Sequence, residues 1–144
     1  MEILDILILG SGPAALCLAS ELAKQNLNIK GISTKSPYEK WENTYGIWAS
    51  ELEEFGLASL LSHRWSKTVS YFGDGIKDKG NSPTKHYYDY GLINQEAFQN
   101  ELLKTCKGIQ WLNETAKLIT SENKISEVIC SSGLKLKARL VIDA

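Results

Sequence analysis

The sequence is short of cysteine, of net charge and of long apolar runs, and each shortage excludes a class of protein. Its three cysteines, Cys17, Cys106 and Cys130, are odd in number, lie far apart and form no C-x-x-C pair, so we expect neither a disulfide framework nor a metal site. The formal net charge is only −1, from 16 basic and 17 acidic side chains. Without a basic field to attract phosphate backbones, we expect no nucleic-acid partner.

The chain also lacks the sequence features of membrane-spanning and secreted proteins. No apolar run approaches the roughly 20 residues that a membrane-spanning helix needs. The first residues lack a basic flank followed by an apolar core and a small-residue cleavage site, so no signal peptide is predicted. Apolar residues make up 43% and charged residues 23%, which is ordinary for a folded domain with a core. We therefore expect a protein that is cytoplasmic or peripheral to a membrane.

The first 33 residues have the pattern of a strand, a helix and a second strand. Residues 3–9 are almost entirely apolar, which predicts a strand buried on both faces of a parallel sheet. Apolar residues at helical spacing predict a helix over 13–25, and 27–33 has the composition of a second strand. Together they predict a βαβ unit, and hence an α/β fold of the Rossmann-like class.

Beyond residue 33 the predicted elements are shorter. We expect a loop over 34–44, a helix over 50–55, a strand over 69–72, a surface loop over 73–85 and a helix over 95–106. Four further strands are expected, at 109–112, 116–121, 125–130 and 134–142. Turn residues separate the last three, which predicts a small antiparallel β-meander that returns to the main sheet.

A glycine-rich turn follows the first strand and is the clearest functional motif. Residues 10–15 fit the pattern G-x-G-x-x-G/A, in which the first glycine allows a tight turn, the second lets the backbone approach a pyrophosphate, and the small sixth residue lets helix and strand pack closely. The free N–H groups and the positive dipole end of the following helix then favour a phosphate. The alternative is a purely structural glycine turn. The predicted cofactor-binding residues here are Gly10, Ser11, Gly12, Pro13, Ala14 and Ala15.

The second strand departs from the usual dinucleotide-binding pattern. Such strands usually end in an acid that accepts hydrogen bonds from ribose hydroxyls, but Ser33 occupies that position. A serine hydroxyl can still form a hydrogen bond to a ribose, and Lys35 offers a positive charge for a 2′-phosphate. Which dinucleotide binds therefore stays open. The alternative is that Ser33 caps the next turn.

An aromatic segment at 41–48, reading WENTYGIW, follows the loop. We interpret Asn43, Tyr45 and Trp48 as a wall beside the cofactor or the substrate. On composition alone, a small satellite core is an equally good interpretation.

Several motifs together resemble the plant- and cyanobacterial-type lycopene cyclases. They are GSGPAA at 10–15, WENTYGIW with its acidic continuation at 41–54, HRWS at 63–66, YGLIN at 90–94 and VIDA at 141–144. The resemblance covers nearly the whole chain, and its order and spacing also match. It implies FAD bound by the glycine turn, with Ala144 beginning a further cofactor element. Gln95 is implied near the cofactor, at a position where related flavoproteins carry arginine.

The resemblance also implies a reaction, the redox-neutral cyclisation of the end groups of lycopene, a linear carotenoid. Protonation of a double bond starts it, and reduced FAD, supplied with electrons by NADPH, stabilises the cation. The proton donor must be an acid whose pKa an apolar pocket raises. Only Glu51 and Glu53 lie next to the aromatic element, and the alternative is that they are solvated charges.

The chain ends on an apolar strand, so we expect residues 1–144 to be the N-terminal half of an FAD-binding domain. The rest of that domain and a substrate domain would lie beyond it, together with any peripheral contact with a photosynthetic membrane. The piece alone is expected to be inactive and to retain FAD weakly. Its oligomeric state and the β or ε ring type stay open. Two alternative functions share the first βαβ unit: an FAD-dependent monooxygenase or isoprenoid-chain reductase, and a non-catalytic nucleotide-binding module.

Overall fold

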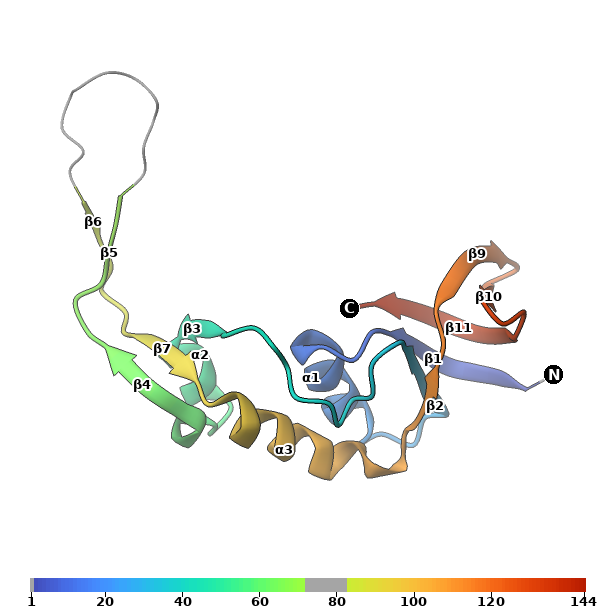
Figure 1. Ribbon diagram of the computed structural model, residues 1–144, viewed down its shortest axis with the longest axis horizontal. Helices are drawn as coiled ribbons and strands as arrows, with labels where there is room; N and C mark the ends of the chain where they lie inside the picture. Colours follow the sequence, from blue (N-terminus) through green and yellow to red (C-terminus); the bar gives the residue numbers. More distant parts are fainter. Residues whose placement is uncertain (1, 72–82) are drawn as a thin grey trace, which may run out of the picture. The chain divides into compact units, whose positions relative to one another are not determined.

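The computed structural model describes residues 2–71 and 83–144, and the chain divides into two compact units (Figure 1). The first unit comprises Met1–Trp41 and Gln99–Ala144, and the second comprises Glu42–Phe98. The chain passes between the units at two places, and the second, at Phe98 and Gln99, falls within a helix.

The first unit is built on a six-stranded sheet in the order β8-β2-β1-β11-β10-β9. Four adjacent strands are parallel, and the last two pair antiparallel at one side (Figure 1). The parallel strands are β1 (Ile3–Leu9), β2 (Ile29–Ser33), β8 (Gln110–Asn113) and β11 (Lys135–Asp143). The antiparallel strands are β9 (Ala116–Glu122) and β10 (Ile125–Cys130). The apolar first strand therefore lies between two parallel neighbours, as its composition predicts.

Two layers of apolar side chains hold this sheet, one on each face of β1. Ile6 and Ile8 pack against Ala15 and Ala19 of helix α1 (Pro13–Leu22). The second layer is a cluster of seven buried residues: Leu4, Leu7, Leu9, Ile32, Val128, Cys130 and Ala138. Small alanines on α1 let the helix lie close to the strand, which positions the helix N-terminus beside the end of β1.

The predicted helices end slightly earlier than the sequence pattern indicates. Helix α1 ends at Leu22 because the amides of Lys24 and Gln25 donate to the carbonyls of Glu21 and Leu22, which is a tighter turn than an α-helix. Helix α3 (Gln95–Thr105) likewise gives way to a short 3₁₀ turn, η2 (Cys106–Gly108). Both helices are confirmed, with bounds shifted by one to three residues.

The second unit contains a three-stranded antiparallel sheet in the order β3-β7-β4. Its strands are β3 (Gly46–Trp48), β7 (Tyr90–Ile93) and β4 (Leu61–Trp65). Helix α2 (Ala49–Glu54) and the 3₁₀ turn η1 (Ala58–Leu60) connect β3 to β4. A separate two-stranded ladder joins β5 (Val69–Ser70) to β6 (Thr84–Lys85).

The structure contains some of the predicted elements and differs from others. The βαβ unit, the loop at 34–44, the helix near 50–55 and the antiparallel meander are confirmed. The surface loop predicted for 73–85 is wrong at Thr84–Lys85, whose backbone pairs with β5, and its residues 73–82 lie outside the described residues. The strand predicted at 69–72 is confirmed for Val69–Ser70; Tyr71 is outside the strand, and Phe72 lies outside the described residues. Strands β3, β4 and β7 were not predicted.

Candidate cofactor site

The glycine turn begins where β1 ends, and its first glycine is required by two independent features. Gly10 has a φ of +110°, which side-chain-bearing residues rarely adopt. A β-carbon at Gly10 would also collide with the carbonyl oxygen of Ala144. The Gly10 amide donates to the carbonyl of Ile32 (2.9 Å), and the Ala144 amide donates to the carbonyl of Leu9 (2.9 Å). These contacts bring the ends of β1, β2 and β11 together.

The second glycine of the turn is free of such crowding. Gly12 is the N-cap of α1, with ordinary extended backbone angles, and a β-carbon there would have no described atom within 4 Å. No described side chain caps α1, and its first turn carries no acid. Its N–H groups and positive dipole end therefore face space that a β-carbon on Gly12 would partly fill. This cradle fits a pyrophosphate, as the sequence motif predicts.

Ser11 links the glycine turn to the end of β2. Its Oγ lies 2.9 Å from the Oγ of Ser33 and donates to the carbonyl of Lys35 (3.0 Å). The indole N–H of Trp41 donates to the carbonyl of Ser11 (3.2 Å). The predicted site residues Ser11 and Ser33 are therefore brought into direct contact. The contribution of Trp41 was missed, because nothing in the sequence indicates that its indole reaches the turn.

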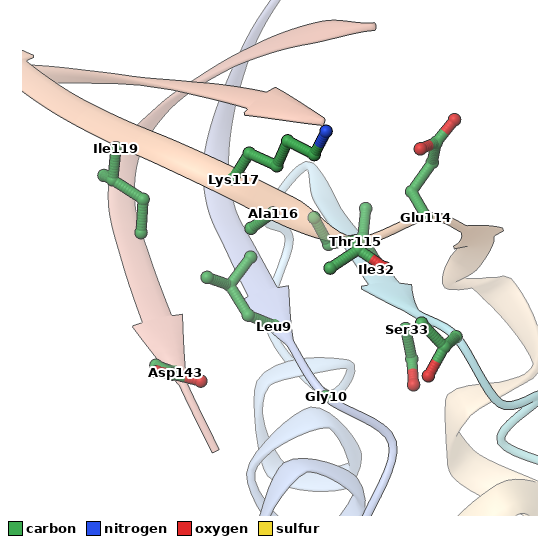
Figure 2. A pocket seen from close by; sticks show the side chains of 11 residues that line it. Leu9, Gly10, Ile32, Ser33, Glu114, Thr115, Ala116, Lys117, Ile119 and Asp143 are labelled. Carbon is green, nitrogen blue, oxygen red and sulfur yellow. The ribbon is translucent and has the colours of Figure 1, made fainter. Parts of the chain in front are cut away.

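A cleft of about 370 Å³ opens where β1, β2 and β11 end (Figure 2). Figure 2 shows Leu9, Ser33 and Asp143 projecting from three different strands around it. The complete lining is Leu9, Gly10, Ile32, Ser33, Thr34, Glu114, Thr115, Ala116, Lys117, Ile119 and Asp143. Its volume lies at the lower end of the roughly 300–1,000 Å³ of ligand pockets, and its position outside the carboxyl ends of parallel strands is where α/β sheets bind ligands.

The connection from β8 to β9 supplies cleft residues that the sequence analysis missed. The Glu114 amide donates to the carbonyl of Ser33 (3.2 Å), which brings the connection to the end of β2. The Glu114 carboxylate accepts from the hydroxyl of Ser132 (2.5 Å), and Lys117 lies further along β9. No motif marks these residues, since their position depends on the pairing of β8 with β2.

The aromatic residues of the second unit form a row across its sheet. Trp48 lies directly opposite Tyr90, which lies opposite Trp65. The Trp48 and Tyr90 rings meet edge to face with centroids 5.4 Å apart, and His86 lies 5.1 Å from Trp48. Trp48 therefore belongs to an aromatic cluster, although its members Tyr90 and Trp65 are exposed rather than buried in a core. Its predicted place in a cofactor or substrate wall stays a prediction.

Three further predicted site residues, Asn43, Tyr45 and Gln95, also lie in the second unit. Asn43 is exposed, and Tyr45 is half-buried before β3. The side-chain nitrogen Nε2 of Gln95 is buried and finds no hydrogen-bond partner among the described residues. The roles of these three residues stay predictions.

The two candidate acids lie in polar surroundings. Glu51 is exposed in the first turn of α2. Glu53 accepts a hydrogen bond from the Nη1 of Arg64 (2.5 Å), whose Nε donates to Asp89 (2.7 Å). These hydrogen bonds, to Asp89 first and Glu53 second, raise the pKa of Arg64. Both side chains are exposed among the described residues, whereas an apolar pocket is what prepares a carboxyl group to donate a proton. Their role as proton donor stays a prediction.

Among the residues that the structure describes, no three His, Cys, Asp or Glu side chains gather into a group that could hold a metal ion. Within the same ranges, 2–71 and 83–144, no helix is long and apolar enough to cross a membrane.

Comparison with known proteins identifies the relatives of the chain. Residues 5–144 match the family described as lycopene cyclase protein. A lycopene beta cyclase of Synechococcus elongatus is 43% identical over 141 residues, which cover 96% of this chain and 33% of that protein. The chloroplastic lycopene beta cyclase of Arabidopsis thaliana is 31% identical over 145 residues, covering 99% of this chain and 28% of that protein. The chain thus spans about a third of the length of these relatives.

Solved structures show the same fold at low sequence identity. A p-nitrophenol 4-monooxygenase from Pseudomonas putida superposes with a TM-score of 0.65 at 19% identity, covering 100% of this chain and 41% of that one. The halogenase PltM gives a TM-score of 0.66 at 16% identity, covering 98% of this chain and 34% of that one. These likenesses confirm the predicted fold class, an α/β Rossmann-like fold, of which the chain covers a part.

Proposed function

Because the chain belongs to the lycopene cyclase family, we propose that the protein is a lycopene cyclase that uses FAD in carotenoid biosynthesis. The observation that carries the proposal is the family match over residues 5–144, which includes the glycine turn and the cleft beside it. The relative from Synechococcus elongatus, named a lycopene beta cyclase, supports a β-ring product. The protein would then be an enzyme of the isomerase type, because ring closure of a carotenoid end group changes no overall oxidation state.

The first unit has the features needed to hold the two phosphates and the adenosine of FAD. The open space at Gly12 and the N-terminus of α1 suit the pyrophosphate. Ser33 and Thr34 line the cleft where the ribose would lie, and Ala144 closes the turn beside Gly10. When bound and reduced, with NADPH as the electron source, FAD would supply negative charge near a developing carbocation.

The substrate would be lycopene, a long apolar molecule delivered from a lipid phase. The coverage of the relatives supports the further proposal that residues 1–144 supply the N-terminal half of the FAD-binding domain, with the rest of it, the substrate domain and any peripheral membrane contact elsewhere in the protein. We further propose a catalytic acid outside Glu51 and Glu53, because both side chains are exposed and Glu53 is hydrogen-bonded to Arg64.

The test is a product analysis with the full-length protein as its gene encodes it. Purified protein is incubated with lycopene in lipid vesicles, FAD and NADPH, and the carotenoids are separated by chromatography. We expect cyclic end groups, with far less NADPH consumed than product formed. Loss of one NADPH per product would overturn the cyclase assignment.

The same experiment separates the alternative functions. A monooxygenase would consume oxygen together with NADPH and add oxygen to its product, and an isoprenoid-chain reductase would return a more saturated chain. Protein that binds FAD but converts no carotenoid under any condition would favour the non-catalytic nucleotide-binding module.

A further inference from the structure

The serine pair at the mouth of the cleft has only one consistent arrangement of its protons. A carbonyl oxygen can only accept, so the hydroxyl of Ser11 must donate its single proton to the carbonyl of Lys35 (3.0 Å). Ser11 Oγ then accepts from its neighbour, and the proton in the 2.9 Å contact belongs to Ser33. Both hydroxyl protons are therefore committed within the protein.

This arrangement leaves Ser33 able only to accept a hydrogen bond from a ligand. Of its two acceptor positions, one receives the backbone N–H of Lys35 (3.3 Å). The other is left for a donor in the cleft, which Ser33 lines. Because the Ser33 hydroxyl donates its proton to Ser11, it can only accept a hydrogen bond from a ligand. In this respect it resembles a carboxylate oxygen, but it carries no charge.

We propose that Ser11 is a positioning residue that turns Ser33 into a fixed acceptor for a ribose hydroxyl of the FAD adenosine. The inference rests on the proposed function, since it takes FAD as the ligand of the cleft. It explains how the chain manages without the acid that usually ends the second strand. Ser33 meets the ribose, and Ser11, which stands at a variable position of the glycine motif, acts through it.

The first experiment compares FAD with analogues that lack the 2′- or the 3′-hydroxyl of the adenosine ribose. Apoprotein of the full chain is titrated with each, and binding is followed by the quenching of flavin fluorescence. We expect one of the two analogues to bind wild type about tenfold more weakly, the value of one hydrogen bond. In Ser33→Ala that discrimination should fall to about twofold or less, with FAD itself bound about tenfold more weakly.

The second experiment isolates Ser11. Ser11→Ala frees the proton of Ser33, so the variant should lose several-fold in FAD affinity and most of its discrimination between FAD and the sensitive analogue. Ser33→Asp supplies an acceptor that needs no partner to set its proton, and should bind FAD at least as well as wild type. In the double variant Ser11→Ala, Ser33→Asp, the cost of Ser11→Ala should disappear, which a merely structural role of Ser11 would not allow.

A matched control is available in the same sheet. Ser121 and Ser126 form a second serine pair, 2.8 Å apart on β9 and β10, and neither lines the cleft. Ser121→Ala should leave FAD affinity and analogue discrimination unchanged.

The outcomes separate this inference from the proposed function. If wild type fails to bind FAD, both fail. If wild type binds FAD but Ser33→Ala discriminates the analogues as wild type does, or Ser33→Asp binds more weakly than Ser33→Ala, the inference alone is overturned. Retention of the Ser11→Ala effect in the Ser33→Asp background would likewise reject the positioning role.

Discussion

The ring of Tyr90 lies over Gly46 of the neighbouring strand, so closely that a β-carbon on Gly46 would collide with the phenol. The glycine gives the ring a flat piece of backbone to cover, and the ring in turn meets Trp48 edge to face. Glycine inside a strand usually weakens it, but here it marks a close approach that the aromatic row requires.

Gly46→Ala should therefore destabilise the protein by about 1–3 kcal/mol, because the Tyr90 ring must move and its contact with Trp48 is disturbed. Thermal unfolding monitored by tryptophan fluorescence measures the effect. Gly108→Ala is the matched control, since a β-carbon at Gly108 has no described atom within 4 Å. Equal melting temperatures for Gly46→Ala and wild type would contradict the close packing.

Substituting the two glycines of the cofactor turn should have different effects, one on stability and the other on FAD binding. Gly10→Ala introduces a β-carbon at a φ of +110° and against the carbonyl of Ala144, so it should lower the melting temperature of the apoprotein. Gly12→Ala meets no atom within 4 Å, so the apoprotein should unfold as wild type does. Its methyl group would stand in the space that the pyrophosphate needs, and FAD binding should fall at least tenfold.

Paired measurements of apoprotein melting and FAD titration read out this difference. A Gly12→Ala protein that binds FAD normally would show that the phosphates lie elsewhere. A Gly12→Ala apoprotein that melts as low as Gly10→Ala would mean that the second glycine is structural, which is the alternative that the sequence left open.

The sequence predicted the turn and missed most of the cleft for physical reasons. The apolar run of β1 and the glycine spacing are local signals, and β1, the turn and α1 are contiguous in the chain. Glu114 and Lys117 reach the cleft only because Ser33 pairs with Asn113 across two strands far apart in sequence. A pattern read along one segment contains no information about that pairing.

Strands of the second unit were missed for a different reason. β4 begins at Leu61 but continues through Ser62, His63 and Arg64, so it lacks a run of strand-forming apolar residues. It is a strand because β7 lies beside it, with Leu61 covering Gly91. The strand conformation of β4 therefore depends on its pairing with β7, and the strand propensity of its own residues does not reveal that pairing.

A buried glutamine on α3 holds the loop that follows β2. Gln99 is only 6% exposed, and its Nε2 donates to the carbonyls of Pro37 (2.8 Å) and Glu39 (2.7 Å). Gln99→Leu would leave both carbonyls without this donor, so we expect a loss of about 1–3 kcal/mol in stability and faster proteolysis within the loop. Gln110→Leu, at an exposed position on β8, is the control. A Gln99→Leu loop that resists protease as wild type does would contradict this role.

Replacing Glu51 or Glu53 should change turnover little. Glu53→Gln weakens an exposed ion pair, which is worth about 0–1 kcal/mol, and Glu51→Gln removes a solvated charge. Both full-length variants should therefore keep cyclase turnover within about threefold of wild type, a small change in barrier height. A loss of a hundredfold or more in either variant, with FAD still bound, would identify that residue as the proton donor.

Stability at alkaline pH should depend on Cys106. Burial, and secondarily the nearby Cys17, raises the pKa of this thiol from 9.0 to about 11. A group whose pKa is raised by folding contributes stability that is complete below its unfolded pKa and is lost as the pH rises through its folded pKa.

Cys106 is 2% exposed, so Cys106→Ala should lower the melting temperature at pH 8 through lost packing. The difference in melting temperature between wild type and Cys106→Ala should then narrow between pH 9 and 11, because ionisation of the thiol destabilises the wild-type protein. For Val128→Ala, a buried residue that does not titrate, the gap should stay constant. Parallel curves of melting temperature against pH for Cys106→Ala and wild type would refute the dependence of stability on Cys106 ionisation.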